Sequence, residues 1–148
     1  MINQDLYKGS PQQYVAVDCV IFGYEDYQLK LLLMPRPLEP SIGGWSLMGG
    51  FCDDYESLEP AATRVLEKNT GLTDIYLEQV QAFSDVDRDP GGRVISMVYY
   101  ALIPLFQQDI EKVHKRGARW FPVNELPELI FDHQDMVDLA LKKLQMRA

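Results

Sequence analysis

Hydrophobic residues fall along the chain in short runs that polar turns separate. The runs are rich in Val, Ile and Leu, which favours β-strands, and they predict strands at 14–22, 28–34, 75–83, 94–105 and 119–123. The polar residues 23–27 between the first two runs predict the turn of a hairpin. The run at 94–105 is apolar almost throughout, which indicates a central strand covered on both faces.

Two further segments carry apolar residues at helical spacing. In the predicted helix 57–69, Ser57 suits the N-cap, Pro60 falls in the first turn and Gly71 is a C-terminal stop. Its core face consists of Leu58, Ala61, Ala62, Val65 and Leu66. A second amphipathic helix is predicted over 132–146.

The intervening segments are predicted to be loops. Prolines at 35, 37 and 40 interrupt any strand after 34, and an Asp-Pro-Gly-Gly turn marks the polar loop 84–92. A short apolar stretch, 45–48, precedes a turn at Gly49-Gly50. The order of hairpin, helix, strands and helix predicts an α/β fold in which a mixed β-sheet is sandwiched between α-helices. We expect one domain over 1–148, with a flexible N-terminal segment at 1–12.

Composition narrows the possible partners. Asp and Glu outnumber Lys and Arg by 22 to 14, for a net charge of −8, whereas nucleic-acid binders usually present a basic face. No apolar run approaches the roughly 20 residues that cross a bilayer. The N-terminus lacks the apolar core of a signal peptide, and the two cysteines have no metal-ligand spacing. We therefore expect a cytoplasmic protein without direct nucleic-acid or membrane contact.

Residues 50–72 contain a long spaced motif. Its matching positions are Gly50, Glu56, Arg64, Leu66, Gly71 and Leu72. The spacing resembles the Nudix box, in which a Gly and a Glu precede a helix that carries an Arg and three further glutamates. The resemblance implies a Nudix fold, with a structural ion pair between Glu56 and Arg64. The alternative is that these two residues are unrelated surface charges.

The helix departs from that box at its three glutamate positions, which here are Val65, Lys68 and Asn69. Positions i, i+3 and i+4 share one helix face, and in the family this face gathers carboxylates that hold Mg²⁺ or Mn²⁺. Lys68 would repel a divalent cation, and Glu67 points away from this face as a solvated charge. We expect no catalytic residues, no metal ligands and no cofactor; Mg²⁺ enters only if the chain is a hydrolase with substitute ligands.

A second motif, Asp-Arg-Asp-Pro-Gly-Gly-Arg at 87–93, resembles a stretch of one Nudix branch. That branch contains ADP-ribose pyrophosphatases and Nudix-related transcriptional regulators of NAD and sugar metabolism. Segments 120–127 and 131–133 resemble the same branch, so the resemblance extends over about 14–144. In the regulators a Nudix-like domain senses a metabolite and a winged-helix domain following it binds DNA. The resemblance implies a sensor domain, with no DNA-binding domain in this chain.

The predicted ligand site combines charged residues of the loops and of the predicted helix with Gly49 and Gly50. Its members are Arg36, Gly49, Gly50, Lys68, Asp85, Arg88, Asp89 and Arg93. Guanidinium groups suit phosphates and sugar hydroxyls, and Lys68 would replace part of the charge of the missing metal. Alternatives stay open: a solvated charge for Arg36, a salt bridge of Arg88 with Asp87 or Asp89, and aspartates that bind only their own turns.

Four residues outside this set have two interpretations each. Asp18 interrupts an apolar strand, which is costly unless the carboxylate is hydrogen-bonded or faces a cleft. Trp45 and Tyr99 suit the core better than a stacked ligand ring, and His133 is expected to cap or pack against the last helix.

The favoured function is a non-catalytic sensor domain of a transcriptional regulator. Its ligand would be a sugar, such as the pentose arabinose, or a nucleotide-sugar such as ADP-ribose, and the resemblance implies a homodimer. One alternative is an active hydrolase of ADP-ribose or a related nucleoside diphosphate derivative, with ligands drawn from Asp53, Asp54, Glu56 and Glu67. The other is a dimerisation scaffold.

Overall fold

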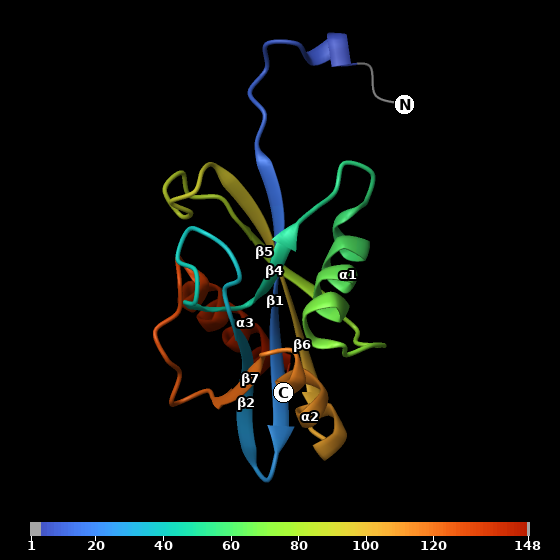
Figure 1. The fold of residues 1–148 in the computed structure, drawn as a ribbon, viewed down its shortest axis with the longest axis vertical. Helices are drawn as coiled ribbons and strands as arrows, with labels where there is room; N and C mark the ends of the chain where they lie inside the picture. Colours follow the sequence, from blue (N-terminus) through green and yellow to red (C-terminus); the bar gives the residue numbers. More distant parts are fainter. Residues whose placement is uncertain (1–3, 148) are drawn as a thin grey trace.

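A seven-stranded mixed sheet organises the computed structural model, which describes residues 4–147. The strands are β1 (Tyr14–Glu25), β2 (Gln28–Pro35), β3 (Trp45–Ser46), β4 (Met48–Phe51), β5 (Glu78–Phe83), β6 (Val94–Pro104) and β7 (Arg119–Pro122). The helices are a 3₁₀ turn at Gln4–Tyr7, α1 (Leu58–Thr70), α2 (Gln107–Lys115) and α3 (His133–Arg147). This arrangement confirms the predicted α/β class (Figure 1).

Strand β1 is the axis of the sheet. It pairs in parallel with β6 along its whole length, from Tyr14↔Val94 to Tyr24↔Pro104. On its other side it pairs antiparallel with β4 near its start and with β2 near its end. Strand β6 lies between β1 and β5, which confirms the inner position that its apolar run predicts. Because β4 sits beside the first half of β1, the box glycines lie next to the start of the central strand.

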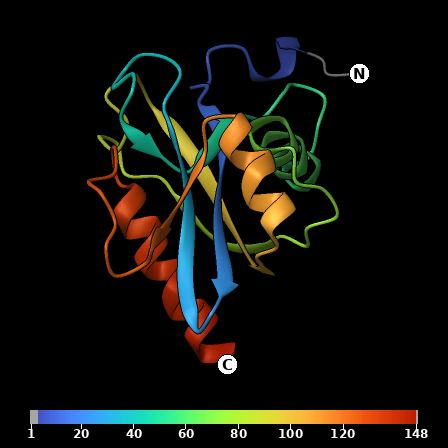
Figure 2. The ribbon, with the colours of Figure 1, turned by 60° about the horizontal axis from the view of Figure 1, so that its bottom comes forward.

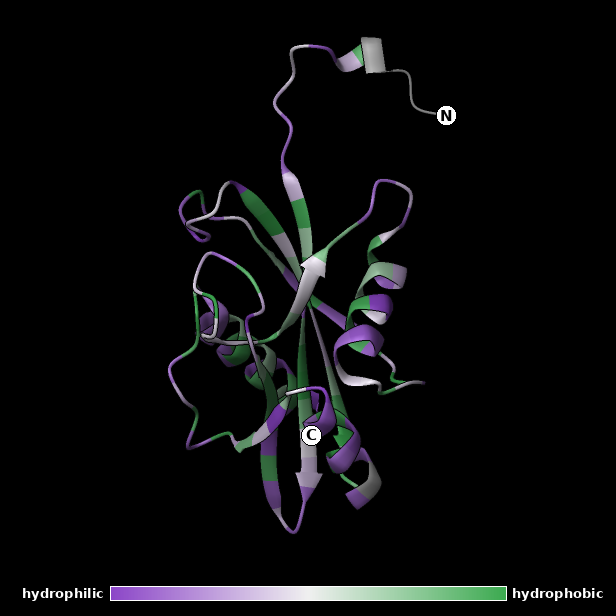
Figure 3. Cartoon of the chain, in the orientation of Figure 1, coloured by the Kyte–Doolittle hydropathy of each residue, from purple (hydrophilic) through white to green (hydrophobic). Residues whose placement is uncertain are grey.

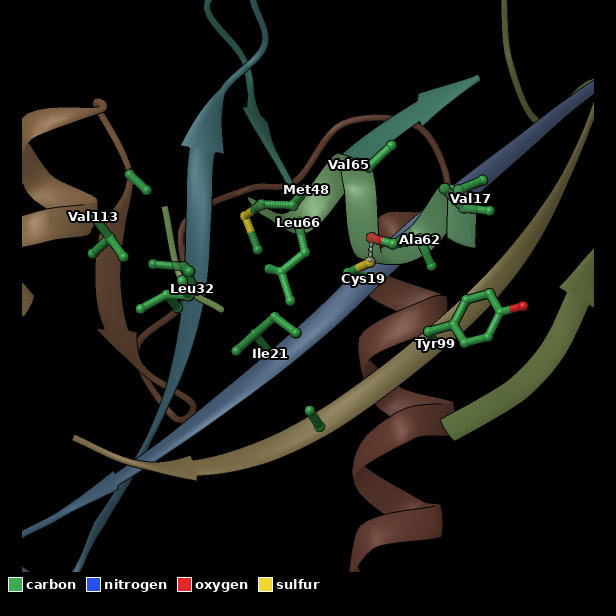
Figure 4. Packing of buried hydrophobic residues seen from close by; sticks show 14 residues of the cluster. Val17, Cys19, Ile21, Leu32, Met48, Ala62, Val65, Leu66, Tyr99 and Val113 are labelled. Atoms are coloured by element: carbon green, nitrogen blue, oxygen red, sulfur yellow. Dashed lines mark hydrogen bonds between the residues drawn. The ribbon is translucent and has the colours of Figure 1, made fainter. Parts of the chain in front are cut away.

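The sheet is covered on both faces (Figure 2). Alternate residues of β1 point to opposite faces, so Val17, Cys19 and Ile21 pack with α1 and α2, whereas Val20 and Phe22 pack with α3. Figure 4 shows the first of these clusters, in which the Cys19 thiol donates to the carbonyl oxygen of Ala62 at 3.7 Å. The predicted core face of α1 is confirmed, since Ala61, Ala62, Val65 and Leu66 are all buried.

The first hairpin is tighter than predicted. Its turn consists of Asp26 and Tyr27, both with positive φ (50° and 60°), a conformation that suits a two-residue hairpin loop. Gly23, predicted to belong to the turn, continues strand β1 and pairs with Lys30. A Cβ atom on Gly23 would lie 2.7 Å from the side chain of Leu105, so the glycine serves close packing rather than the turn.

The predicted turn at Gly49-Gly50 is wrong, because both residues lie within β4 and pair with Asp18 and Val17. Neither glycine has a positive φ. Instead, a Cβ on Gly49 would come 2.3 Å from Asp18 Oδ1, and one on Gly50 would come 2.9 Å from Val65 Cγ2. Neighbouring side chains therefore leave no room for a Cβ atom at either position, which explains why both residues are glycines.

Several boundaries follow from tertiary contacts. Helix α2 was not predicted, because its nine residues offer few apolar positions; among those whose burial is described, Val113 is the one that is fully buried in the core. Strand β5 begins at Glu78 rather than at 75, since its pairing with β6 starts there. The predicted ends of α1 are right: Ser57 is the N-cap, although its side chain makes no capping hydrogen bond, and Gly71 adopts φ 77° at the C-terminus.

The segment before β1 leads away from the sheet (Figure 1). Within the stretch predicted to be flexible, residues 4–7 form the 3₁₀ turn, whereas residues 1–3 lie outside the described part of the chain. Figure 3 shows hydrophobic residues along the central strands and hydrophilic residues in the loops. Both cysteines are free. Within residues 4–147, no helix has the length and apolar character to span a membrane.

Candidate ligand pocket

A pocket opens beside the start of β1, where two long loops meet β4 and the start of α3. Figures 1 and 2 show the loop after β2 and the loop before β6 on the same side of the sheet. We call this hollow the β4 pocket; its volume is about 110 Å³. Its polar lining consists of Asp18, Arg36, Ser46, Arg88, Asp89 and His133, and its other walls include Phe51, Val94 and Phe131.

The β4 pocket brings together five of the eight predicted ligand residues, namely Arg36, Gly49, Gly50, Arg88 and Asp89. Lys68, Asp85 and Arg93 do not line it. Lys68 is exposed on α1, which packs on the other face of the sheet from α3. Asp85 is exposed and its backbone carbonyl accepts from the Arg88 amide, while Arg93 is half-buried. The structure therefore brings five of the eight predicted residues together at this pocket, and the sheet separates Lys68 from the loops.

Arg36 is one of two arginines that line the pocket, together with Arg88. Its backbone closes the long loop by pairing with Gly43 and Gly44. Its Nε donates to the carbonyl oxygen of Leu38 at 3.0 Å, and its guanidinium carbon lies 5.0 Å from the centre of the Phe131 ring. Among the described residues no carboxylate lies within ion-pair distance of Arg36. The charge is thus positioned by carbonyls and a ring, and it remains available to an anion.

Arg88 lines the pocket, but its salt-bridge partner differs from the one predicted. It was expected to bind ligand or to pair with Asp87 or Asp89, but it forms a bidentate pair with Asp132, at 2.8 and 2.9 Å. Its Nη1 donates to the carbonyl oxygen of Val94 at 3.3 Å, and its side chain is 3% exposed. The contacts that occupy this guanidinium fasten the loop before β6 to the start of α3. Asp89 accepts from the Gly91 amide at 2.7 Å, as the turn interpretation expects.

A buried polar chain forms the floor of the pocket. Ser96 Oγ donates to Asp18 Oδ2 at 2.5 Å, and His133 Nε2 lies 3.6 Å from Asp18 Oδ1. His133 Nδ1 accepts from the backbone amide of Leu47 at 3.2 Å, so a neutral imidazole carries its proton on Nε2, toward Asp18. Asp18, Ser96 and His133 were absent from the predicted site. A carboxylate within an apolar strand was the one signal that pointed to it.

Burial shifts both titratable groups of this floor. It lowers the pKa of His133 below its ordinary value, and the nearby Asp18 acts in the opposite direction. Burial also raises the pKa of Asp18, against the effects of His133, Ser96 and Arg88. Both shifts disfavour charge in the same small volume, which is what desolvation does to an acid and a base.

His133 should make stability fall as the pH is lowered. Its depressed pKa means that, below its unfolded value of about 6.5, the unfolded chain binds a proton that the folded chain resists. The wild-type unfolding free energy should then drop from pH 7.5 to 5.5, by at most about 1.4 kcal/mol per pH unit from this group. Protonation of Asp18, whose raised pKa favours the folded state at low pH, opposes this loss.

Urea denaturation across this range tests the effect. His133→Asn keeps an acceptor for the Leu47 amide but cannot titrate, so its pH slope should be smaller than that of the wild type. The other histidine, His114, is exposed, and His114→Asn should keep the wild-type slope. An unchanged slope in His133→Asn would show that another group controls the acid sensitivity.

The box loop is held by an ion pair. Arg64 Nη2 lies 2.5 Å from Glu56 Oε1, Arg64 Nε donates to Glu56 Oε2 at 3.1 Å, and Arg64 Nη2 also donates to the carbonyl oxygen of Phe51 at 2.9 Å. Glu56 in turn accepts from the Asp53 amide, and the hydrogen bond from Arg64 lowers the pKa of Glu56. The structure thus forms the predicted pair, which joins the loop between β4 and α1 to the helix.

The face of α1 that would hold a divalent metal does not fit one. Val65 is 3% exposed in the core and contacts Gly50, so it presents methyl groups where Mg²⁺ needs oxygen. Lys68 on the next turn is a cation. No group of three or more His, Cys, Asp or Glu side chains is placed to hold a metal within the described part of the chain.

Comparison with known proteins is consistent with this fold. The NUDIX domain family model matches residues 12–140. The chain is 34% identical over 140 residues to the ADPR responsive transcriptional repressor NtrR of Acinetobacter baylyi, covering 90% of this chain and 55% of the repressor. It is 33% identical over 124 residues to the ADP-ribose pyrophosphatase of Methanocaldococcus jannaschii, covering 83% of this chain and 70% of that enzyme.

Among solved structures, the NUDIX domain of Shewanella oneidensis NrtR complexed with ADP ribose is 33% identical, with a TM-score of 0.78 and coverage of 97% of this chain and 99% of that one. The chain therefore spans a complete NUDIX domain of one relative but about half the length of the repressor. The predicted resemblance to pyrophosphatases and regulators is confirmed. With a family match over most of its length and a third of its residues identical to these relatives, the chain belongs to the NUDIX domain family.

Proposed function

We propose that this chain is a non-catalytic NUDIX sensor domain that binds ADP-ribose in the β4 pocket and regulates transcription. The observation that carries the proposal is the combination of an accessible pocket with a box helix that does not fit a metal. Arg36 offers a cation and Asp18 an acceptor, while Val65 and Lys68 occupy positions where hydrolysis needs carboxylates. A site of this kind retains recognition of a sugar phosphate without the means of cleaving it.

The relatives favour ADP-ribose over a free pentose. The repressor relative is ADP-ribose responsive by its description, and the NrtR NUDIX domain was crystallised with ADP ribose. Nothing in the comparisons supports arabinose, the other ligand that the sequence analysis expects. Homodimerisation and a cytoplasmic location stay predictions. The expected absence of nucleic-acid contact also stays a prediction, and the relationship to a repressor does not support it.

Binding should stabilise the fold without added metal. ADP-ribose at a hundred times its Kd should raise the unfolding free energy by about 2.7 kcal/mol, in EDTA as in Mg²⁺. Arg36→Gln should reduce this shift, because it removes the unpaired cation of the pocket wall. Arg119→Gln, which changes an exposed arginine outside the pocket, is the matched control. Thermal melts with ADP-ribose, ADP and arabinose measure the effect.

The panel separates the competing functions. If arabinose alone stabilises the protein, arabinose rather than ADP-ribose is the ligand. Stabilisation that requires Mg²⁺ would favour the hydrolase alternative, which is tested because one relative is a pyrophosphatase. No response to any of the three ligands would contradict the sensor proposal and favour a dimerisation scaffold.

A further inference from the structure

We propose that Asp18 determines the ligand specificity of the β4 pocket, by accepting hydrogen bonds from adjacent hydroxyls of a terminal ribose whose phosphate is held by Arg36. This inference rests on the proposed function and assigns an orientation to the ligand. The ribose end enters the pocket floor, and the rest of the nucleotide extends outward.

Asp18 has acceptor capacity that the protein does not use. The residue is 6% exposed, and burial of a carboxylate is costly unless it is well hydrogen-bonded. Ser96 supplies one short bond, but His133 Nε2 at 3.6 Å from the other oxygen is beyond hydrogen-bond distance. A carboxyl oxygen can accept about two hydrogen bonds, and among the described residues none donates one to Oδ1 of Asp18. Arg88, a buried cation that lines the same pocket, pairs with Asp132 instead.

Gly49 leaves the approach to Asp18 open. Strand β4 runs antiparallel to β1, and Gly49 is the partner of Asp18 in that pairing. A Cβ at position 49 would lie 2.3 Å from Asp18 Oδ1 and so would occupy the space beside that oxygen. Both residues line the pocket. The absence of a side chain at 49 therefore keeps Oδ1 within reach of a ligand donor.

The size and charge of the pocket select the group that enters. Pockets that enclose a complete small-molecule ligand have volumes of roughly 300–1,000 Å³, whereas this one has about 110 Å³, which suits a single sugar ring. An acceptor lies on its floor at Asp18 and a cation on its wall at Arg36. Vicinal hydroxyls can donate hydrogen bonds to Asp18 on the floor, and a phosphate can pair with Arg36 on the wall. A ribose phosphate therefore fits better than an adenine, because most ring nitrogens of adenine are acceptors.

Calorimetric titration of two ligand pairs tests the assignment. The first pair is ADP-ribose and ADP, which differ by the terminal ribose and its phosphate linkage, and the second is ribose 5-phosphate and 2-deoxyribose 5-phosphate. Wild type should prefer the ribose-bearing member of each pair. Asp18→Asn, which keeps an oxygen for Ser96, should weaken ADP-ribose about tenfold or more, the effect of losing hydrogen bonds to a charged group. It should leave ADP nearly unchanged.

The matched control is Asp87→Asn, which makes the same charge change at an exposed residue outside the β4 pocket. It should retain the wild-type affinities. Equal weakening of ADP-ribose and ADP by Asp18→Asn would overturn the proposal, because it would mean that Asp18 does not distinguish the ribose. Wild type that fails to bind ADP-ribose would contradict the proposed function instead. If the Asp18→Asn variant does not fold, the second ligand pair still tests the proposal on the wild-type protein. The wild type should then bind 2-deoxyribose 5-phosphate more weakly than ribose 5-phosphate, because the deoxy sugar lacks the 2-hydroxyl.

Discussion

Replacing Arg88 by methionine is expected to lower the unfolding free energy by about 3–5 kcal/mol. The side chains of Arg88 and Asp132 are 3% and 17% exposed, and their two hydrogen bonds join the loop before β6 to α3. Removing the guanidinium leaves the Asp132 carboxylate with poor access to water and no counterion. It also leaves the carbonyl oxygen of Val94 without this donor. Urea denaturation at neutral pH measures the loss.

A second arginine pair provides the comparison. Arg147 pairs with Glu78, but its side chain is 57% exposed, so water screens the charges and Arg147→Met should cost far less unfolding free energy than Arg88→Met. The reciprocal change Asp132→Asn should be costly like Arg88→Met, because it leaves the buried guanidinium without its anion. Similar losses in Arg88→Met and Arg147→Met would mean that the buried pair does not anchor the loop.

Hydrolysis of ADP-ribose is expected to be negligible in the presence of Mg²⁺. A working enzyme of this class should reach about 1 per second or more, but catalysis needs a cluster of carboxylates that this helix replaces with Val65, Lys68 and Asn69. Phosphate release after coupled phosphatase treatment measures the rate. Turnover near enzyme values that disappears in Glu67→Gln would contradict the non-catalytic interpretation, and Glu128→Gln, at an exposed residue outside the box, is its control.

Restoring the glutamates adds a stability readout. Val65 is 3% exposed and packs in the α1 cluster, so Val65→Glu combined with Lys68→Glu and Asn69→Glu should destabilise the fold by several kcal/mol in EDTA. Mg²⁺ should recover part of that loss if the new carboxylates converge on it. Full activity is not expected, because metal sites also depend on the groups that orient the ligands.

The sequence by itself determined the elements whose signals are local. Alternating or continuous apolar runs set the long strands, and the helix α1 was marked by Pro60 and Gly71 as well as by its apolar face. The box spacing also foretold the Glu56–Arg64 pair, because loop and helix are separated there by only eight positions. Helix α2 was not predicted because its position depends on the burial of Val113 in the core rather than on a run of apolar residues along the sequence.

Only the tertiary structure decided how the pocket is built. Asp18 and Ser96 are separated by 78 positions, and the Leu47 amide meets His133 across 86, so no local pattern connects them. The parallel pairing of β1 with β6 brings the first two together, and the packing of α3 adds the third group. The same sheet places Lys68 on its other side, away from the loops. Charges that look alike along the chain thus acquire different roles, because burial and the partners across the sheet decide which of them remain available to a ligand.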